Sequence, residues 1–137
     1  MVDKKIKEEM LQKIEDGSFG VNDIKEYMDL FVELANESED VEYEIEGWDR
    51  ILNFKLENAN NFSLVFEDGE ITLGNLIENA DVTLELDAKI AAGVFTGEID
   101  ATSAYMSGDL KIKGALPDAV KFRTIVELVR EELEDDW

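Results

Sequence analysis

Apolar residues near the start of the chain recur at helical spacing. From residue 4 to 15 they fall on one face of a helix, with Asp3 placed to cap its first turn and Gly17 to end it. A second helix is predicted from about residue 23 to 36. The two apolar stripes are Ile6, Met10, Leu11 and Ile14, then Ile24, Tyr27, Met28, Phe31 and Leu34. Such stripes are typical of helices that pack against a core.

The pattern changes to alternation after residue 40. Apolar and polar residues alternate over residues 41–45, 52–56, 62–66, 71–73 and 82–86, which predicts strands with one face exposed to water. The pair Asp68-Gly69 predicts a tight turn before the fourth of these strands. Because the connections are too short to hold crossover helices, we expect an antiparallel meander.

Helical composition returns after Asp87. Short helices are predicted over 88–95 and 101–106, separated by a break at Thr96-Gly97, and a last strand is predicted around 110–112. Pro117 suits the first turn of a final helix, because its missing amide has no helical partner there. The apolar positions of this helix are Val120, Phe122, Ile125, Val126, Val129 and Leu133.

This order of elements and the chain length predict a single α+β domain over residues 1–137. It would consist of N-terminal helices (1–36), a core (38–133) and an acidic tail (134–137) that frays.

The charge balance narrows the functions that the chain can have. Of the 137 residues, 13 are basic and 34 are acidic, which gives a formal net charge of −21, and there is no histidine or cysteine. These absences exclude a Ser-His-Asp triad, a thiolate nucleophile, histidine- or thiolate-bound metals and disulfides. The negative charge repels phosphate backbones, so no nucleic-acid partner is expected. Apolar runs are too short to cross a bilayer and no secretory signal is visible, so the expected location is cytoplasmic.

Two charged segments are candidates for a binding site. The acidic stretch 37–46 is spread along a predicted strand, so its carboxylates would not converge on a cation, and neither a metal site nor a cofactor is expected. Residues 111–123 instead carry Lys111, Lys113, Lys121 and Arg123 against the single acid Asp118. These cations either lie on solvated faces, paired with acidic neighbours, or form a landing patch for anionic headgroups beside an apolar site.

A set of short motifs follows in fixed order between residues 80 and 121. They are Ala80-Asp81-Val82-Thr83-Leu84-Glu85-Leu86, Thr96-Gly97, Ser103-Ala104-Tyr105-Met106-Ser107-Gly108, Leu110-Lys111-Ile112-Lys113-Gly114, and Ala119 with Lys121. In this order they resemble the sterol carrier protein type-two family. Ala101 and Ala115 stand where members of that family often carry proline and asparagine. The N-terminal helices and the acidic tail lie outside the part that matches well.

The resemblance implies a five-stranded, mostly antiparallel sheet covered by helices, with an apolar tunnel between sheet and helices. It implies non-enzymatic binding and transfer of a sterol, fatty acyl or isoprenoid lipid, with transient membrane contact and no catalytic residues. We expect the tunnel walls to come from the short helices and the last helix. The candidate lipid-binding residues are Ile90, Val94, Phe95, Tyr105, Met106, Phe122, Ile125, Val126 and Val129.

Other functions stay open at this point. The family fold also serves as an accessory domain in larger enzymes and in quinone-biosynthesis helpers, so the fold alone does not name the ligand. The alternative to lipid transfer is therefore an interaction module that presents lipid to, or stabilises, a biosynthetic complex. The sequence does not identify the protein partner of such a module. A third alternative is a carboxylate-dependent hydrolase of lipid esters.

Overall fold

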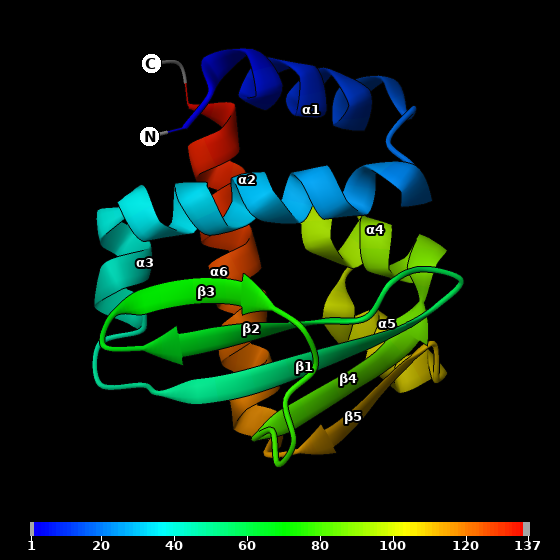
Figure 1. Cartoon of the computed structure of the whole chain (residues 1–137). Coiled ribbons are helices and arrows are strands. Elements are labelled where there is room, and N and C mark those ends of the chain that lie inside the picture. The colour runs from blue at the N-terminus through cyan, green and yellow to red at the C-terminus, as the bar shows by residue number, and fades with distance from the viewer. Residues whose placement is uncertain (1, 136–137) are drawn as a thin grey trace.

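A computed structural model describes residues 2–135 of the chain. Figure 1 shows the elements in the order of the sequence. The helices are α1 (Lys4–Asp16), α2 (Ile24–Glu37), α3 (Glu39–Glu44), α4 (Ala88–Thr96), α5 (Ala101–Ser107) and α6 (Leu116–Glu134), with a 3-10 turn at Val21–Asp23. The strands are β1 (Arg50–Glu57), β2 (Phe62–Glu67), β3 (Glu70–Gly74), β4 (Val82–Asp87) and β5 (Leu110–Gly114).

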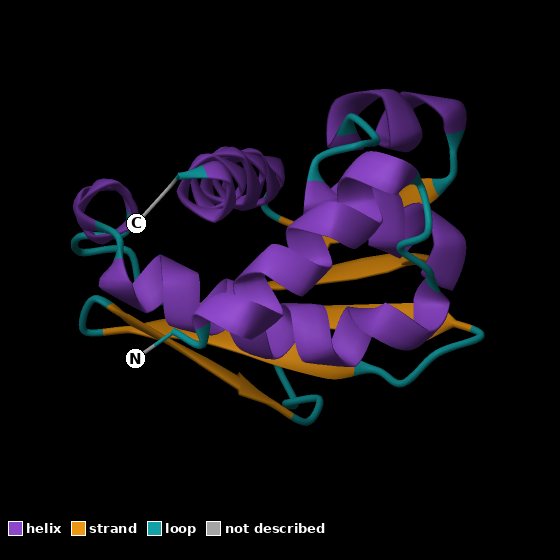
Figure 2. Cartoon of the chain, turned by 90° about the horizontal axis from the view of Figure 1, so that it is seen from above, coloured by secondary structure: helices purple, strands orange, loops and turns teal. Residues whose placement is uncertain are grey.

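The strands of the described range form one five-stranded sheet in the order β3-β2-β1-β4-β5. The pairs β1–β2, β2–β3 and β4–β5 are antiparallel, whereas β1–β4 is parallel. Figures 1 and 2 show the strands in one twisted layer and the helices in another, with α6 running behind the sheet. The predicted α+β class and the mostly antiparallel five-stranded sheet are confirmed.

The predicted strand at 41–45 is wrong, because this segment forms the helix α3. Ser38 caps the helix by accepting a hydrogen bond from the Val41 amide at 3.2 Å. Val41 and Ile45 are four residues apart, so in a helix they share one face, and both are buried. Tyr43 lies between them in the sequence and is 80% exposed, which alternation in a strand would not produce.

The predicted meander is also wrong at one place, because β4 lies beside β1 and not beside β3. Gly74 at the end of β3 is level with Ser63 and Asn53, and Val82 at the start of β4 pairs with Leu52. The connection 75–81 therefore only has to cross the sheet and need not return along it. Three strand spacings are about 14 Å, and this loop can extend to about 23 Å, so no crossover helix is needed.

Two polar side chains hold this crossing loop against the sheet. Asn53 donates from Nδ2 to the Ile77 carbonyl at 2.7 Å and accepts from the Ile77 amide at 3.1 Å. Ser63 donates to the Asn75 carbonyl at 2.7 Å. Because Asn53 and Ser63 are buried, these bonds satisfy groups that would otherwise be costly to bury.

The core lies between the sheet and the helices and is centred on aromatic side chains. Phe54 of β1 has its ring centroid 5.1 Å from that of Phe122 on α6 and 5.4 Å from that of Phe95 on α4. Phe31 of α2 lies 6.1 Å from Phe122. These contacts join α2, α4 and α6 to the same place on the sheet, which fixes α6 relative to β1.

The helix boundaries otherwise follow the sequence prediction. Asp3 caps α1 through its carboxylate, which accepts from the Lys5 amide at 2.9 Å, and Gly17 ends the helix in the left-handed region. At the other end of the chain Glu134 still belongs to α6, and the Asp135 carbonyl accepts from the Lys7 ammonium at 2.6 Å. The predicted fraying of the tail therefore does not begin at residue 134, and residues 136–137 lie outside the described residues.

Candidate lipid-binding site

A cavity of about 440 Å³ opens between α5, β5 and the N-terminal half of α6. Its inner walls are apolar and buried, and its outer walls carry exposed apolar and charged side chains. The residues that line it are Leu84, Val94, Gly97, Glu98, Ile99, Asp100, Ala101, Thr102, Tyr105, Leu110, Ile112, Leu116, Ala119, Val120, Phe122, Arg123, Val126 and Glu127. An apolar cavity that reaches the surface can bury an alkyl or ring system and leave a head at its mouth.

The loop between α4 and α5 gives the cavity one of its walls. Gly97 ends α4 with φ 82°, and Asp100 caps α5 by accepting from the Ser103 amide at 3.3 Å and its hydroxyl at 3.0 Å. The Ile99 amide donates to the Gly93 carbonyl at 3.0 Å, and the Ile99 side chain packs where a Cβ on Gly93 would stand. The lack of a side chain at Gly93 therefore allows Ile99 to lie against α4.

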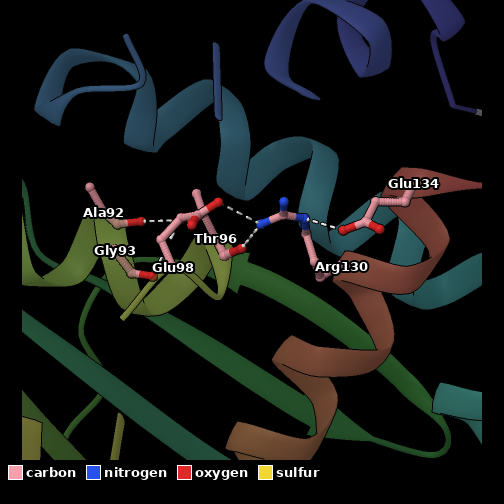
Figure 3. Close-up of polar contacts among 6 residues, drawn as sticks. All are labelled: Ala92, Gly93, Thr96, Glu98, Arg130 and Glu134. Carbon is pink, nitrogen blue, oxygen red and sulfur yellow. Dashed lines mark hydrogen bonds and ion pairs between the residues drawn. The ribbon is translucent and has the colours of Figure 1, made fainter. Parts of the chain in front are cut away.

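Two arginines of α6 clamp this loop. Figure 3 shows Arg130, which donates from Nη1 to the Thr96 carbonyl at 2.6 Å and to Glu98 at 3.1 Å, while its Nε pairs with Glu134 at 2.8 Å. Seven residues earlier, Arg123 pairs in the same manner with Asp100 at 3.2 Å and with Glu127 at 3.5 Å.

Each of the two arginines thus joins one acid of the loop to one acid of its own helix.

The Asp100 carboxylate is the better held of the two loop acids. Its hydrogen bonds from Ser103 and the nearby Arg123 guanidinium outweigh the cost of partial desolvation and hold the pKa of Asp100 below its usual range. Asp100 is therefore ionised at neutral pH and leaves a fixed negative charge at the edge of the cavity.

The structure brings together part of the predicted site. Val94, Tyr105, Phe122 and Val126 line the cavity. The other five candidates lie elsewhere: Phe95, Ile125 and Val129 are buried in the core, Ile90 is partly buried against it, and Met106 is 81% exposed beside Tyr105. Whether any of the nine contacts a lipid stays a prediction.

Sequence reasoning missed several residues of the cavity wall. Ile99 lies in a loop without a periodic pattern, and the sequence predicts Leu110 and Ile112 only as strand residues, with no role in a site. Leu116 and Val120, at the start of α6, are large apolar residues that remain 45% and 54% exposed in the structure. An amphipathic helix whose apolar stripe extends beyond its buried face is typical of a helix that borders a cavity or an interface.

The basic segment is largely neutralised in the structure. Lys113 pairs with Glu85 at 2.8 Å, and Lys121 donates to the Glu44 carbonyl at 2.9 Å. Arg123 belongs to the clamp described above. Three of the four cations are thus engaged with acidic residues, as expected if these cations lie on solvated faces and pair with acidic neighbours.

Residues 2–135 contain no group of three or more acidic side chains arranged to hold a metal ion. None of the helices in this range has both the length and the apolar character needed to cross a membrane.

Solved structures share this arrangement of sheet and helices. The sterol carrier protein domain 2 of Helicoverpa armigera aligns with a TM-score of 0.63 over 81% of this chain and 91% of its own, at 21% identity. Sterol carrier protein 2 of Yarrowia lipolytica aligns with a TM-score of 0.58 over 74% of this chain and 88% of its own, at 20% identity. A ubiquinone synthesis protein, UbiJ-SCP2, aligns with a TM-score of 0.61 over 80% of this chain and 94% of its own, at 17% identity. The fold is therefore that of the sterol carrier proteins.

The chain belongs to the SCP-2 sterol transfer family, whose model matches residues 28–127. The predicted family is thereby confirmed, and membership of it supports lipid binding and transfer. Among curated proteins, hydroxysteroid dehydrogenase-like protein 2 of Xenopus tropicalis is 35% identical over 72 residues, which are 51% of this chain and 17% of that protein. Its Bos taurus counterpart is 32% identical over 65 residues, which are 47% of this chain and 16% of that protein. The chain thus spans less than a fifth of the length of these relatives.

Proposed function

We propose that the chain binds one hydrophobic lipid in the cavity beside α5, β5 and α6 and transfers it without chemical change. The observation that carries the proposal is an apolar cavity of about 440 Å³ in a member of the SCP-2 family. Ligand sites commonly enclose roughly 300–1,000 Å³, so a sterol, fatty acyl or isoprenoid tail is of a suitable size. Each buried methylene contributes about 0.8 kcal/mol before the costs of association.

The lipid tail would contact the inner wall, whose apolar residues are buried or partly buried. We assign this role to Val94, Phe122 and Val126 among the predicted residues, and to Ile99 and Leu110 among those found in the structure. The predicted residues that lie in the core, such as Phe95 and Ile125, would support this wall from behind.

The exposed apolar residues of the outer wall support transient membrane contact. Tyr105, Leu116 and Val120 line the cavity and are 42%, 45% and 54% exposed, and Met106, which follows Tyr105 in α5, is 81% exposed. Large apolar side chains gathered at one place on the surface favour contact with an apolar or interfacial surface. A bilayer that receives these side chains would lie directly at the mouth of the cavity.

The first test is native mass spectrometry of freshly purified protein, together with lipid analysis of its organic extract. A discrete added mass that is lost on denaturation and recovered in the extract would support the proposal and give the class of the lipid. An apo mass that persists after incubation with vesicles containing sterols, fatty acyl lipids and isoprenoids would refute it.

A matched pair of variants locates the binding site. Ala119 lines the cavity on α6 and Ala80 lies on the loop that crosses the opposite face of the sheet. Ala119→Phe fills the cavity and should weaken lipid binding about tenfold or more, whereas Ala80→Phe should bind like the wild type. Equal binding by both variants, each with an unchanged melting temperature, would place the lipid elsewhere.

A second candidate function is an accessory module that presents lipid to a biosynthetic complex. It is supported by the likeness to UbiJ-SCP2, whose name describes a ubiquinone synthesis protein. It is also supported by α1, which precedes the region that the family model matches and offers a separate surface. Affinity capture with the full chain, with and without a competing excess of residues 1–36 as a peptide, would reveal a protein partner bound through that region. The absence of any captured protein would refute this candidate.

A further inference from the structure

The charged residues of the cavity are gathered at its mouth. Arg123, Asp100 and Glu127 are 44%, 45% and 61% exposed in their side chains, whereas Phe122 and Val126 on the inner wall are buried. A lipid that fills the cavity would therefore place its tail against the apolar residues and its head among the charged ones.

The mouth has an excess of negative charge. The cavity lining contains the carboxylates of Glu98, Asp100 and Glu127 against the single guanidinium of Arg123, a net charge of −2. Extending the count to the second clamp adds Arg130 and Glu134, which cancel, so the net charge stays the same.

Both arginines that clamp the loop between α4 and α5 are already paired. Arginine is the side chain best suited to hold a carboxylate, sulfate or phosphate head, because its donors match two oxygens at once. Here the Arg123 Nε lies 3.2 Å from Asp100 and 3.5 Å from Glu127, and Arg130 donates to the Thr96 carbonyl and to Glu98. An anionic head that took Arg123 from Asp100 would face the released carboxylate at the same place.

The lysines near the cavity do not change this balance. On β5 the side chain of Ile112 lines the cavity, so its neighbours Lys111 and Lys113 point to the opposite face of the sheet, where Lys113 pairs with Glu85. Lys121 is directed toward α3, where it donates to the Glu44 carbonyl.

We propose that the cavity selects lipids with an uncharged head, such as an alcohol or a sterol hydroxyl, over lipids of equal tail with an anionic head. This inference rests on the proposed function, since it concerns the same cavity. An uncharged hydroxyl can accept from Arg123 or donate to Asp100 without breaking their ion pair, whereas an anionic head meets three carboxylates.

The test compares hexadecanol with hexadecyl sulfate, which have the same 16-carbon chain and differ in the charge of the head. Both are supplied together in phosphatidylcholine vesicles to the full chain, and the lipid bound to the re-isolated protein is measured by mass spectrometry. Because the same vesicles serve every variant, differences in the bound ratio arise from the protein.

Two variants with the same net charge separate the local effect from the overall one. Glu127→Lys brings the charge at the mouth from −2 to 0, and Glu15→Lys makes the same change on α1, away from the cavity. We expect Glu127→Lys to raise the bound ratio of sulfate to alcohol roughly tenfold at low salt, and Glu15→Lys to leave it nearly unchanged. At high salt the difference should shrink, because the Debye length falls to about 3 Å at 1 M.

The outcomes distinguish this inference from the function on which it rests. Binding of both lipids with the same ratio in the wild type, Glu127→Lys and Glu15→Lys would overturn the selection by head charge and leave lipid binding intact. Binding of neither lipid by any folded variant would refute the proposed function, and this inference with it. Retention of the fold is checked by circular dichroism and thermal melting.

Discussion

Replacing Asp118 by alanine tests how the start of α6 is fixed to the sheet. Asp118 lies in the first turn of α6 and is 8% exposed. Its Oδ1 accepts from the Trp48 indole at 3.0 Å, and its Oδ2 accepts from the Arg50 Nε at 3.0 Å. The Asp118→Ala variant loses both bonds, which link α6 to the segment that enters β1.

The two bonds differ in what their loss costs. Trp48 is 8% exposed, so its indole N–H is left without a partner, at a cost of about 1–3 kcal/mol. The Arg50 side chain is 38% exposed and regains water, so its share is only about 1 kcal/mol or less. We therefore expect Asp118→Ala to lower the free energy of unfolding by about 1–4 kcal/mol.

The assay is urea unfolding followed by far-ultraviolet circular dichroism, with Trp48→Phe as the partner in a double-mutant cycle. Since Trp48→Phe removes the indole donor, the cost of Asp118→Ala should fall by about 1–2 kcal/mol in that background. A cost below about 0.5 kcal/mol for Asp118→Ala, or a coupling near zero, would refute the reasoning.

Two further predictions concern the ends of secondary-structure elements. Gly114 has φ 120°, and a Cβ there would collide with the Asp81 carbonyl oxygen, so Gly114→Ala should cost about 2 kcal/mol or more in urea unfolding. Gly74→Ala is the control, since its Cβ would have ordinary contacts, and equal costs would contradict the argument. Burial alone would raise the pKa of Asp23, but its bonds from the Lys13 ammonium at 2.7 Å and the Gly20 amide at 2.9 Å lower it overall. The ionised Asp23 therefore stabilises the fold above its unfolded pKa of about 3.9, and this contribution is lost as the pH falls through the lower folded pKa. Asp23→Asn should thus be less stable than the wild type near neutral pH, with the gap narrowing in urea unfolding as the pH falls below about 3.9, and a gap independent of pH would contradict this.

Most helices and strands were predictable from the sequence, and the short helix α3 was the exception. α1, α2 and α6 each repeat the helical period over several turns, so their existence and faces follow from it. α3 has only six residues, and a pattern of that length fits a strand and a helix equally well. The decisive feature is Ser38, whose hydroxyl caps the helix. A cap distinguishes a helix from a strand where the period of apolar residues does not.

The order of the strands depended on contacts far apart in the chain. Alternation shows which face of a strand is buried but does not identify its neighbour. The neighbour of β4 is set by the register that ends β3 level with Asn53 and by the bonds of Asn53 and Ser63 to the crossing loop. Asn53 and Ser63 occupy alternating polar positions, so their pattern in the sequence is the same as that of solvent-exposed residues.

The cavity shows why the candidate site was only partly predicted. α6 carries two apolar stripes, and Ile125, Val129 and Leu133 form the one that is fully buried in the core. The other stripe passes from Leu116 to Val126 along the cavity. Both stripes satisfy the helical period, so periodicity could not separate a core face from a cavity wall.

What separates the two stripes is the character of the residues between the apolar ones. The core stripe continues at Ile125, Val129 and Leu133, whose side chains are all buried, as a close-packed interior requires. The cavity stripe includes Arg123 and Glu127, whose ion pairs need water nearby, and an exposed Val120. A helical stripe that mixes large apolar residues with paired charges therefore marks a wall that reaches the surface, and in α6 that wall is where a lipid would enter.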